Sequence, residues 1–185
     1  MTVIAPPGDQ VPPRRTGRVG ALEPAMALPC GRDHDGSPGR LDETARRLTH
    51  EEFAVARQLA SEGHQVRSLA ERRDRGRTAD LSVCDAPVEV KSWLGRQERG
   101  GIAPGARSVV NKLLQAEGQA PTVVLNGRGS GLTATAARAG MLDYAGLERP
   151  NPVRAVRVLG DGFDLAWARG RSIRRDRGPD LGVGL

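Results

Sequence analysis

Three charged side chains stand at a spacing that suits phosphate chemistry. Asp80 opens a predicted β-hairpin, and Glu89 and Lys91 lie on its second strand. Side chains alternate between the two faces of a strand, so Glu89 and Lys91 share one face while Val88 and Val90 share the other. The hairpin brings the Asp80 carboxylate near Glu89. Paired carboxylates can hold Mg²⁺ (or Mn²⁺), and a neighbouring lysine can orient the water that attacks a phosphodiester.

The identity of Lys91 is informative because lysine is rare in this chain. Of the 28 basic residues, 26 are arginines, and the two lysines are Lys91 and Lys112. Arginine scarcely deprotonates and is less compact than lysine, so it serves poorly beside a metal-activated water. A catalytic role gives Lys91 a chemical reason to be lysine in an arginine-rich background.

The Glu-x-Lys pattern alone has a second interpretation, which is an ordinary ion pair on a solvated strand. Three features favour a site: an acid one short strand upstream, a helix and a buried strand downstream, and a Glu-bearing helix that precedes the set. Two further side chains are candidates for substrate binding. Lys112 lies on a predicted helix, where a solvated face would suit it equally, and Arg128 lies in a Gly-rich loop. The N–H groups of that loop could bind an anion, or its glycines could serve only a tight turn.

Hydrophobic periodicity predicts a mixed α/β domain with a central sheet in the order α-β-β-β-α-β, followed by α-β-β. The predicted helices cover 41–62, 106–117 and 133–146, and the predicted strands cover 65–69, 80–84, 88–91, 121–125, 153–159 and 163–167. The run 121–125 is continuously apolar, as in a strand buried on both faces. Asp85-Ala86-Pro87 is predicted to turn the hairpin that carries the site.

Amino-acid composition along the 185 residues predicts where the folded domain begins and ends. Residues 1–40 hold seven of the 13 prolines and predict a disordered segment, and 168–185 predict a basic disordered tail, which leaves 41–167 as one domain. The net charge is +6, but 149–185 carry eight basic and four acidic residues, so the domain itself is nearly neutral. No apolar run approaches the ~18 residues of a membrane span, and no apolar signal opens the chain. These features predict a cytoplasmic protein with no membrane partner.

The element order with Ala79-Asp80 and Glu89-Val90-Lys91 resembles the PD-(D/E)XK nuclease superfamily, whose restriction-endonuclease-like core has this order. Within it, the chain is most similar to the C-terminal nuclease domains of contact-dependent growth-inhibition and other polymorphic toxins, many of them tRNases. The similarity covers about 51–147. Its text includes Glu52-Phe53-Ala54-Val55-Ala56, Gly63-His64-Gln65-Val66, Thr78-Ala79-Asp80-Leu81, Val88-Glu89-Val90-Lys91-Ser92, Gly118-Gln119-Ala120-Pro121 and Arg128-Gly129-Ser130-Gly131-Leu132.

The resemblance implies a role for each matching residue. Asp80 and Glu89 match the metal-binding acids, Lys91 matches the catalytic lysine, and Ser92 matches a supporting position. Glu52 matches the helix glutamate that completes such a metal site, with its neighbour Glu51 as the alternative. Ala79 departs from the Pro of the motif but leaves the metal acid in place.

The implied function is that of a Mg²⁺-dependent endonuclease. The toxin resemblance favours RNA, with tRNA-like substrates, and a cognate inhibitor protein, whereas the fold alone would favour DNA. Two other classes stay open. One is a nucleic-acid-binding module without catalysis, and the other is an inactive relative that serves as a protein-interaction domain.

Overall fold

The computed structural model describes residues 39–70, 78–93 and 102–169, in which seven strands form one sheet and three helices pack on it. The strands lie side by side in chain order, which confirms the predicted mixed α/β class. The elements are β1 (Arg40–Asp42), α1 (His50–Ser61), β2 (Gln65–Ser68), β3 (Leu81–Val83), β4 (Ala86–Ser92), α2 (Ala106–Ala116), β5 (Thr122–Asn126), α3 (Ala134–Ala145), β6 (Ala155–Gly160) and β7 (Phe163–Ala168).

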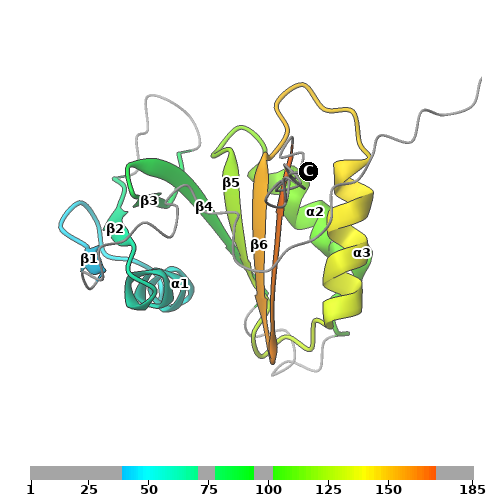
Figure 1. Cartoon of the computed structure of the whole chain (residues 1–185), viewed down its shortest axis with the longest axis horizontal. Coiled ribbons are helices and arrows are strands. Elements are labelled where there is room, and N and C mark those ends of the chain that lie inside the picture. Colours follow the sequence, from blue (N-terminus) through cyan, green and yellow to red (C-terminus); the bar gives the residue numbers. More distant parts are fainter. Residues whose placement is uncertain (1–38, 71–77, 94–101, 170–185) are drawn as a thin grey trace, which may run out of the picture.

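Two hydrophobic cores lie on opposite faces of the sheet, because alternate residues of each central strand point to opposite sides. On one face, Leu59 of α1 packs with Val90 of β4 and Val124 of β5. On the other face, Leu113 of α2 packs with Val123 of β5 and with residues of α3. Figure 1 shows α1 beside the first strands and α2 and α3 together on the far side of the sheet. Helix α3 approaches α2 closely at Gly140, where a Cβ atom would lie 2.5 Å from the Ala106 carbonyl oxygen.

The centre of the sheet, from β4 to β6, is parallel. β3 and β7 run antiparallel to the strands that flank this centre, and the edge strand β1 is parallel to β2. Strands β4, β5 and β6 run in one direction, with Ser92 at the end of β4 beside Asn126 at the end of β5. All five residues of β5 are buried, as the apolar run predicts. The carboxyl ends of β4 and β5 therefore meet at one edge of the sheet, which is the edge that carries Lys91 and Ser92.

The first helix begins later than the sequence predicts. The prediction of a helix from 41 is wrong, since Arg40–Asp42 forms β1 parallel to β2 and the helix starts at His50. Thr49 caps it: the Thr49 side chain accepts from the Glu52 N–H, and the Glu52 carboxylate accepts from the Thr49 N–H. This capping box fixes the helix start, because it satisfies backbone donors that have no partner inside the helix.

The hairpin turn also differs from the prediction. Cys84 and Asp85 form the turn, both with positive φ (47° and 67°), so Ala86 and Pro87 already belong to β4. Two left-handed residues give the turn the twist that antiparallel neighbours need, and Asp tolerates that conformation. Pro87 is compatible with the strand because the parallel pairing with β5 begins only at Val88.

The predicted domain bounds of 41–167 stay a prediction, because the segments beyond them lie almost wholly outside the described residues. Arg40 belongs to β1 and Ala168 to β7, whereas the predicted disordered segments lie almost wholly in 1–38 and 170–185, outside the described residues. Each helix in the described part of the chain has 11 or 12 residues, and none could cross a lipid bilayer.

An ion cluster ties the end of α1 to the last two strands. Arg157 of β6 donates to Glu62 at 2.6 and 2.8 Å and to Asp164 of β7 at 3.0 Å. The Arg157 side chain is only 6% exposed, while those of Glu62 and Asp164 are 31% and 36% exposed. One buried guanidinium thus forms ion pairs with two half-buried carboxylates.

We expect Arg157→Ala to lower the free energy of unfolding by about 2 kcal/mol, because two acids then lose their shared cation. This is less than the ~3–5 kcal/mol typical of fully buried pairs, since both acids can regain water. Arg154→Ala, an exposed change just before β6, should cost less than about 0.5 kcal/mol. Urea denaturation measures both, and equal losses in the two variants would contradict the role given to Arg157.

Candidate active site

The candidate site forms at the start of β3, beside the part of β4 that continues beyond it. Leu81 pairs with Val88, so an uninterrupted ladder would set Asp80 opposite Glu89. β3 instead begins at Leu81, and Asp80 Oδ2 accepts a hydrogen bond from the Val90 N–H at 2.9 Å. The carboxylate of Asp80 therefore takes up a backbone donor of β4, which fixes it beside the strand that carries Glu89 and Lys91.

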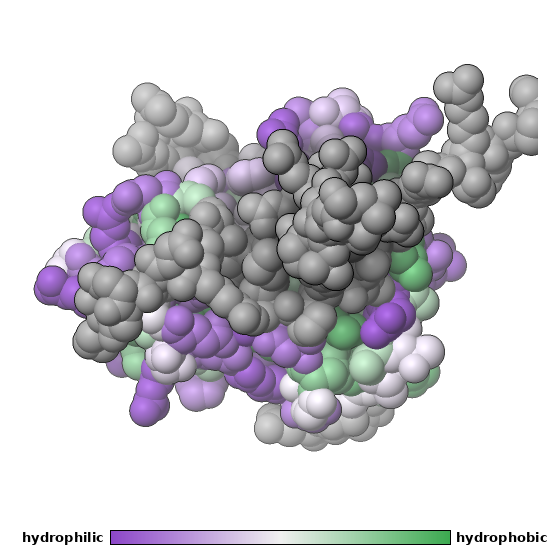
Figure 2. All heavy atoms as spheres, in the orientation of Figure 1, coloured by the Kyte–Doolittle hydropathy of each residue, from purple (hydrophilic) through white to green (hydrophobic). Residues whose placement is uncertain are grey.

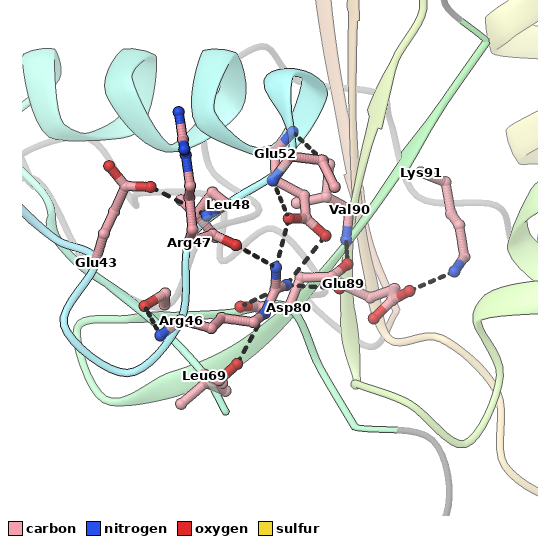
Figure 3. A network of polar contacts seen from close by, with 12 residues as sticks. Glu43, Arg46, Arg47, Leu48, Glu52, Leu69, Asp80, Glu89, Val90 and Lys91 are labelled. Atoms are coloured by element: carbon pink, nitrogen blue, oxygen red, sulfur yellow. Dashed lines mark hydrogen bonds and ion pairs between the residues drawn. The ribbon is translucent and has the colours of Figure 1, made fainter. Parts of the chain in front are cut away.

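A single guanidinium joins the acids on the α1 side of the site. Arg46 Nη1 donates to Glu52 Oε2 at 2.7 Å, and Arg46 Nη2 donates to Glu52 Oε1 at 3.0 Å and to Asp80 Oδ1 at 3.1 Å. Figure 3 shows Asp80 between this group and the Glu89–Lys91 pair. The predicted acids are thus gathered into one region, with an arginine bound to two of them.

Glu89 is the most deeply buried acid of the site. The residue is 1% exposed, and its Oε1 forms an ion pair with the Lys91 ammonium. The other oxygen, Oε2, is buried and has no hydrogen-bond partner among the described residues. A buried carboxylate oxygen without a partner is costly, and a cation bound there would offset that cost.

The charges of the acids influence one another. Burial raises the pKa of Asp80 to about 7, and the charges of Glu89 and Glu52 add to this effect against the opposing hydrogen bond from Val90. Burial also acts to raise the pKa of Glu52, but the hydrogen bonds from Arg46 and Thr49 outweigh it and leave that pKa lowered. Asp80 thus lies close to two other acids in a partly dehydrated setting, which a cation would relieve.

A cavity of about 260 Å³ opens beside the N-terminus of α1. Its lining residues come from the helix start and from the end of β4: Thr49, Glu51, Glu52, Val90 and Ser92. Hydrophilic residues predominate over α1 and the first strands on the face seen in Figure 2. Ser92 and the alternative acid Glu51 line this cavity together with Glu52, whereas Asp80, Glu89 and Lys91 do not.

The two remaining substrate-binding candidates lie apart from the acids. Lys112 of α2 lies over the ring of Trp93, 5.9 Å from its centroid, and Trp93 directly follows Ser92. Arg128 hydrogen-bonds to the Gln58 side chain on α1. The structure therefore places Lys112 near the end of β4, while Arg128 is bound to the middle of α1.

The Gly-rich loop after β5 already binds an anion from within the chain. The Gly129 N–H donates to the Asp161 carboxylate at 2.9 and 3.2 Å. Gly129 and Gly131 have positive φ (67° and 74°), which a tight strand-to-helix turn requires. The turn interpretation of this loop fits better than that of a phosphate-binding loop.

The donor set suits a divalent cation in its chemistry. Mg²⁺ prefers oxygen ligands and is bound by one or two carboxylates, with water and substrate phosphates as its other ligands. The unpartnered Glu89 Oε2 and the neighbouring Asp80 supply such a pair. In the described part of the chain, however, no group of three or more His, Cys, Asp or Glu side chains is arranged to hold a metal. Glu52 is instead bound to Arg46 and Thr49.

Two residues of the site are absent from the sequence-based prediction. Arg46 is one of 26 arginines and carries no local signal, since its partners are 6 and 34 positions away in the chain. Thr49, in contrast, stands three residues before Glu52, and this spacing is a recognisable helix-start signature. The predicted helix from 41 concealed it.

The comparisons with known proteins add little to this geometry. No family model and no curated protein matches the chain. Among solved structures, the chain is similar to the "CdiA-CT/CdiI toxin and immunity complex from Burkholderia pseudomallei", with a TM-score of 0.43 and 17% identity, over 69% of this chain and 98% of that chain. A similarity of this extent defines neither a fold nor an activity, so the chemistry rests on the residues of the site.

The raised pKa of Asp80 predicts a pH-dependent stability. The folded state binds this proton more tightly than the unfolded chain, whose Asp pKa is 3.8. The stabilisation is therefore present at low pH and is lost as the pH rises toward 7. Asp80→Asn does not titrate and still offers an oxygen to the Val90 N–H. The free energy of unfolding of Asp80→Asn, relative to that of the wild type, should therefore increase as the pH rises from about 4 to 7.

Denaturation at several pH values, with a chelator present, measures this gain. Asp85→Asn is the matched control for an exposed aspartate, since the Asp85 side chain is 85% exposed. A constant difference between Asp80→Asn and wild type across this pH range would contradict the account of Asp80.

Proposed function

We propose that this protein is a metal-dependent nuclease that hydrolyses phosphodiester bonds. The observation that carries the proposal is Glu89, which is buried with one oxygen on Lys91 and the other without a partner, beside a second acid. An ordinary ion pair on a solvated strand would leave both oxygens in contact with water. Burial of this carboxylate is costly unless it serves a ligand, and a divalent cation is the ligand that paired acids favour.

Asp80 and Glu89 are the residues that would hold Mg²⁺ or Mn²⁺. The bound ion would supply Lewis-acid stabilisation of charge on the phosphate and would lower the pKa of water. Glu52, implied as a further ligand by the sequence resemblance, is engaged by Arg46. We therefore assign metal binding first to the Asp80 and Glu89 pair.

Lys91 is the residue that would act on the reacting groups. Its ammonium is held by Glu89 on one side, and its side chain is 22% exposed, so it can also contact solvent or substrate. A compact, positively charged donor in this position would orient the attacking water and stabilise negative charge on the scissile phosphate. Ser92, at the cavity beside it, would support the position of the substrate.

The substrate class comes from the sequence resemblance and not from the geometry. That resemblance favours RNA, in particular tRNA-like molecules, over DNA, and it favours a cognate inhibitor protein as a partner. Lys112 lies next to Trp93 at the end of β4, and from there it would contact another phosphate of the bound nucleic acid. Arg128 is a weaker candidate because Gln58 engages it.

We expect the full chain to cleave members of an RNA and DNA panel in the presence of Mg²⁺ or Mn²⁺. Lys91→Ala should lose at least about 100-fold in rate, because it removes a donor that acts on developing charge. Lys91→Arg should also lose most of the activity, since a guanidinium does not replace the compact ammonium. Arg154→Ala, at the opposite edge of the sheet, should cleave like wild type.

Gel-based cleavage rates and filter binding on the same samples distinguish the alternatives. Equal, negligible cleavage by wild type and Lys91→Ala, with salt-sensitive binding that survives Asp80→Ala and Glu89→Ala, would replace this proposal with a non-catalytic nucleic-acid-binding module.

A further inference from the structure

Arg46 is fixed in place by hydrogen bonds of both its backbone and its side chain. It belongs to the segment between β1 and α1, and its backbone N–H donates to Ser68 Oγ at 3.2 Å. Its side-chain Nε donates to the Leu69 carbonyl at 2.9 Å. The side chain is 18% exposed. The guanidinium is thus anchored at its base before it reaches the acids.

The outer nitrogens of Arg46 bind two acids at once. Glu52 receives a two-pronged contact, and its Oε2 also accepts from the Thr49 N–H at 2.8 Å. Both oxygens of Glu52 are therefore used, one of them twice. Asp80 differs, since its Oδ1 accepts a single hydrogen bond from Arg46 Nη2, at the longer distance of 3.1 Å. Glu52 is held firmly, whereas the contact to Asp80 is the one that a stronger cation can displace.

We propose that Arg46 is an internal counter-cation that competes with the divalent metal for Asp80, and so sets the metal affinity of the site. This inference rests on the proposed function, because it takes Asp80 and Glu89 as the metal ligands. In the metal-free protein the single guanidinium is shared between Asp80 and Glu52. When a metal binds, Asp80 is shared or released, while Glu52 stays with Arg46 and the helix cap. Arg46 is a positioning residue and does not contact the substrate in this account.

Charge alone gives the direction of the effect. A positive charge beside the site opposes the approach of a doubly charged ion, and one such charge near a solvent-accessible site changes affinity by about tenfold. Arg46→Met removes the charge and keeps much of the side-chain length. We expect it to bind Mn²⁺ about tenfold more tightly than wild type, and to be less stable without metal because two acids lose their partner.

Calorimetric titration of the full chain with Mn²⁺ measures this difference. Arg47→Met is the matched control, because Arg47 is the exposed neighbour of Arg46. Its substitution removes the same charge one residue away. Arg46→Lys keeps the charge and should bind Mn²⁺ within about threefold of wild type. Equal or weaker Mn²⁺ binding by a folded Arg46→Met, or the same gain in Arg47→Met, would overturn the inference.

A measurement on the wild type serves if Arg46→Met does not fold. The Arg46 Nε–H resonance, followed by ¹⁵N NMR during Mg²⁺ addition, should shift with the same midpoint as metal binding. A resonance that stays unchanged at saturating Mg²⁺ would overturn the competition. The proposed function fails separately: in that case neither wild type nor Arg46→Met shows Mn²⁺ binding that Glu89→Gln removes.

Discussion

Asp80, Glu52 and Glu89 bring three carboxylates to the start of β3 beside β4, and much of the surrounding structure compensates their charge. Burial and mutual repulsion raise the pKa of Asp80 to about 7. Three groups stabilise the charged acids: Arg46 donates hydrogen bonds to Asp80 and Glu52, the Val90 N–H donates to Asp80, and Lys91 forms an ion pair with Glu89. One oxygen of Glu89 is left over. Such an arrangement is unfavourable for a purely structural cluster and suitable for a cation site.

The fold provides this arrangement through its edges and ends. The pairing of β4 with β3 ends at Val88, whereas its pairing with β5 runs on to Ser92. β4 therefore continues beyond β3 and presents Glu89 and Lys91 next to the acid that precedes β3. The capping box of α1 directs Glu52 toward the same point. Arg157, at the other end of α1, holds the helix to β6 and β7. The positions of the acids are thus set by strand register and by a helix cap, both of which are rigid elements.

Local sequence patterns predict most of the elements and the pair at the centre of the site. The alternation of 88–91 and the apolar run of β5 correspond to the observed strands, because each pattern reflects burial by near neighbours. The late start of α1 and the short strand β1 are missed because β1 depends on pairing with β2, which local periodicity does not report. The role of Arg46 depends on a partner 34 residues away. The proximity of Asp80 and Glu89, in contrast, is expected from the predicted hairpin, although the observed turn at Cys84 and Asp85 gives a different register from the predicted one.

In the proposed function, the unpartnered oxygen of Glu89 belongs to a divalent metal site shared with Asp80. Crystals of the wild-type chain soaked in Mn²⁺ test it most directly, through the anomalous signal of the ion. We expect a peak at about 2.1 Å from Glu89 Oε2, the distance typical of Mg²⁺-like ions, with Asp80 as a second ligand and Lys91 still on Oε1. A fully soaked crystal with no peak there, or with Glu89 Oε2 hydrogen-bonded to a protein group instead, would contradict it.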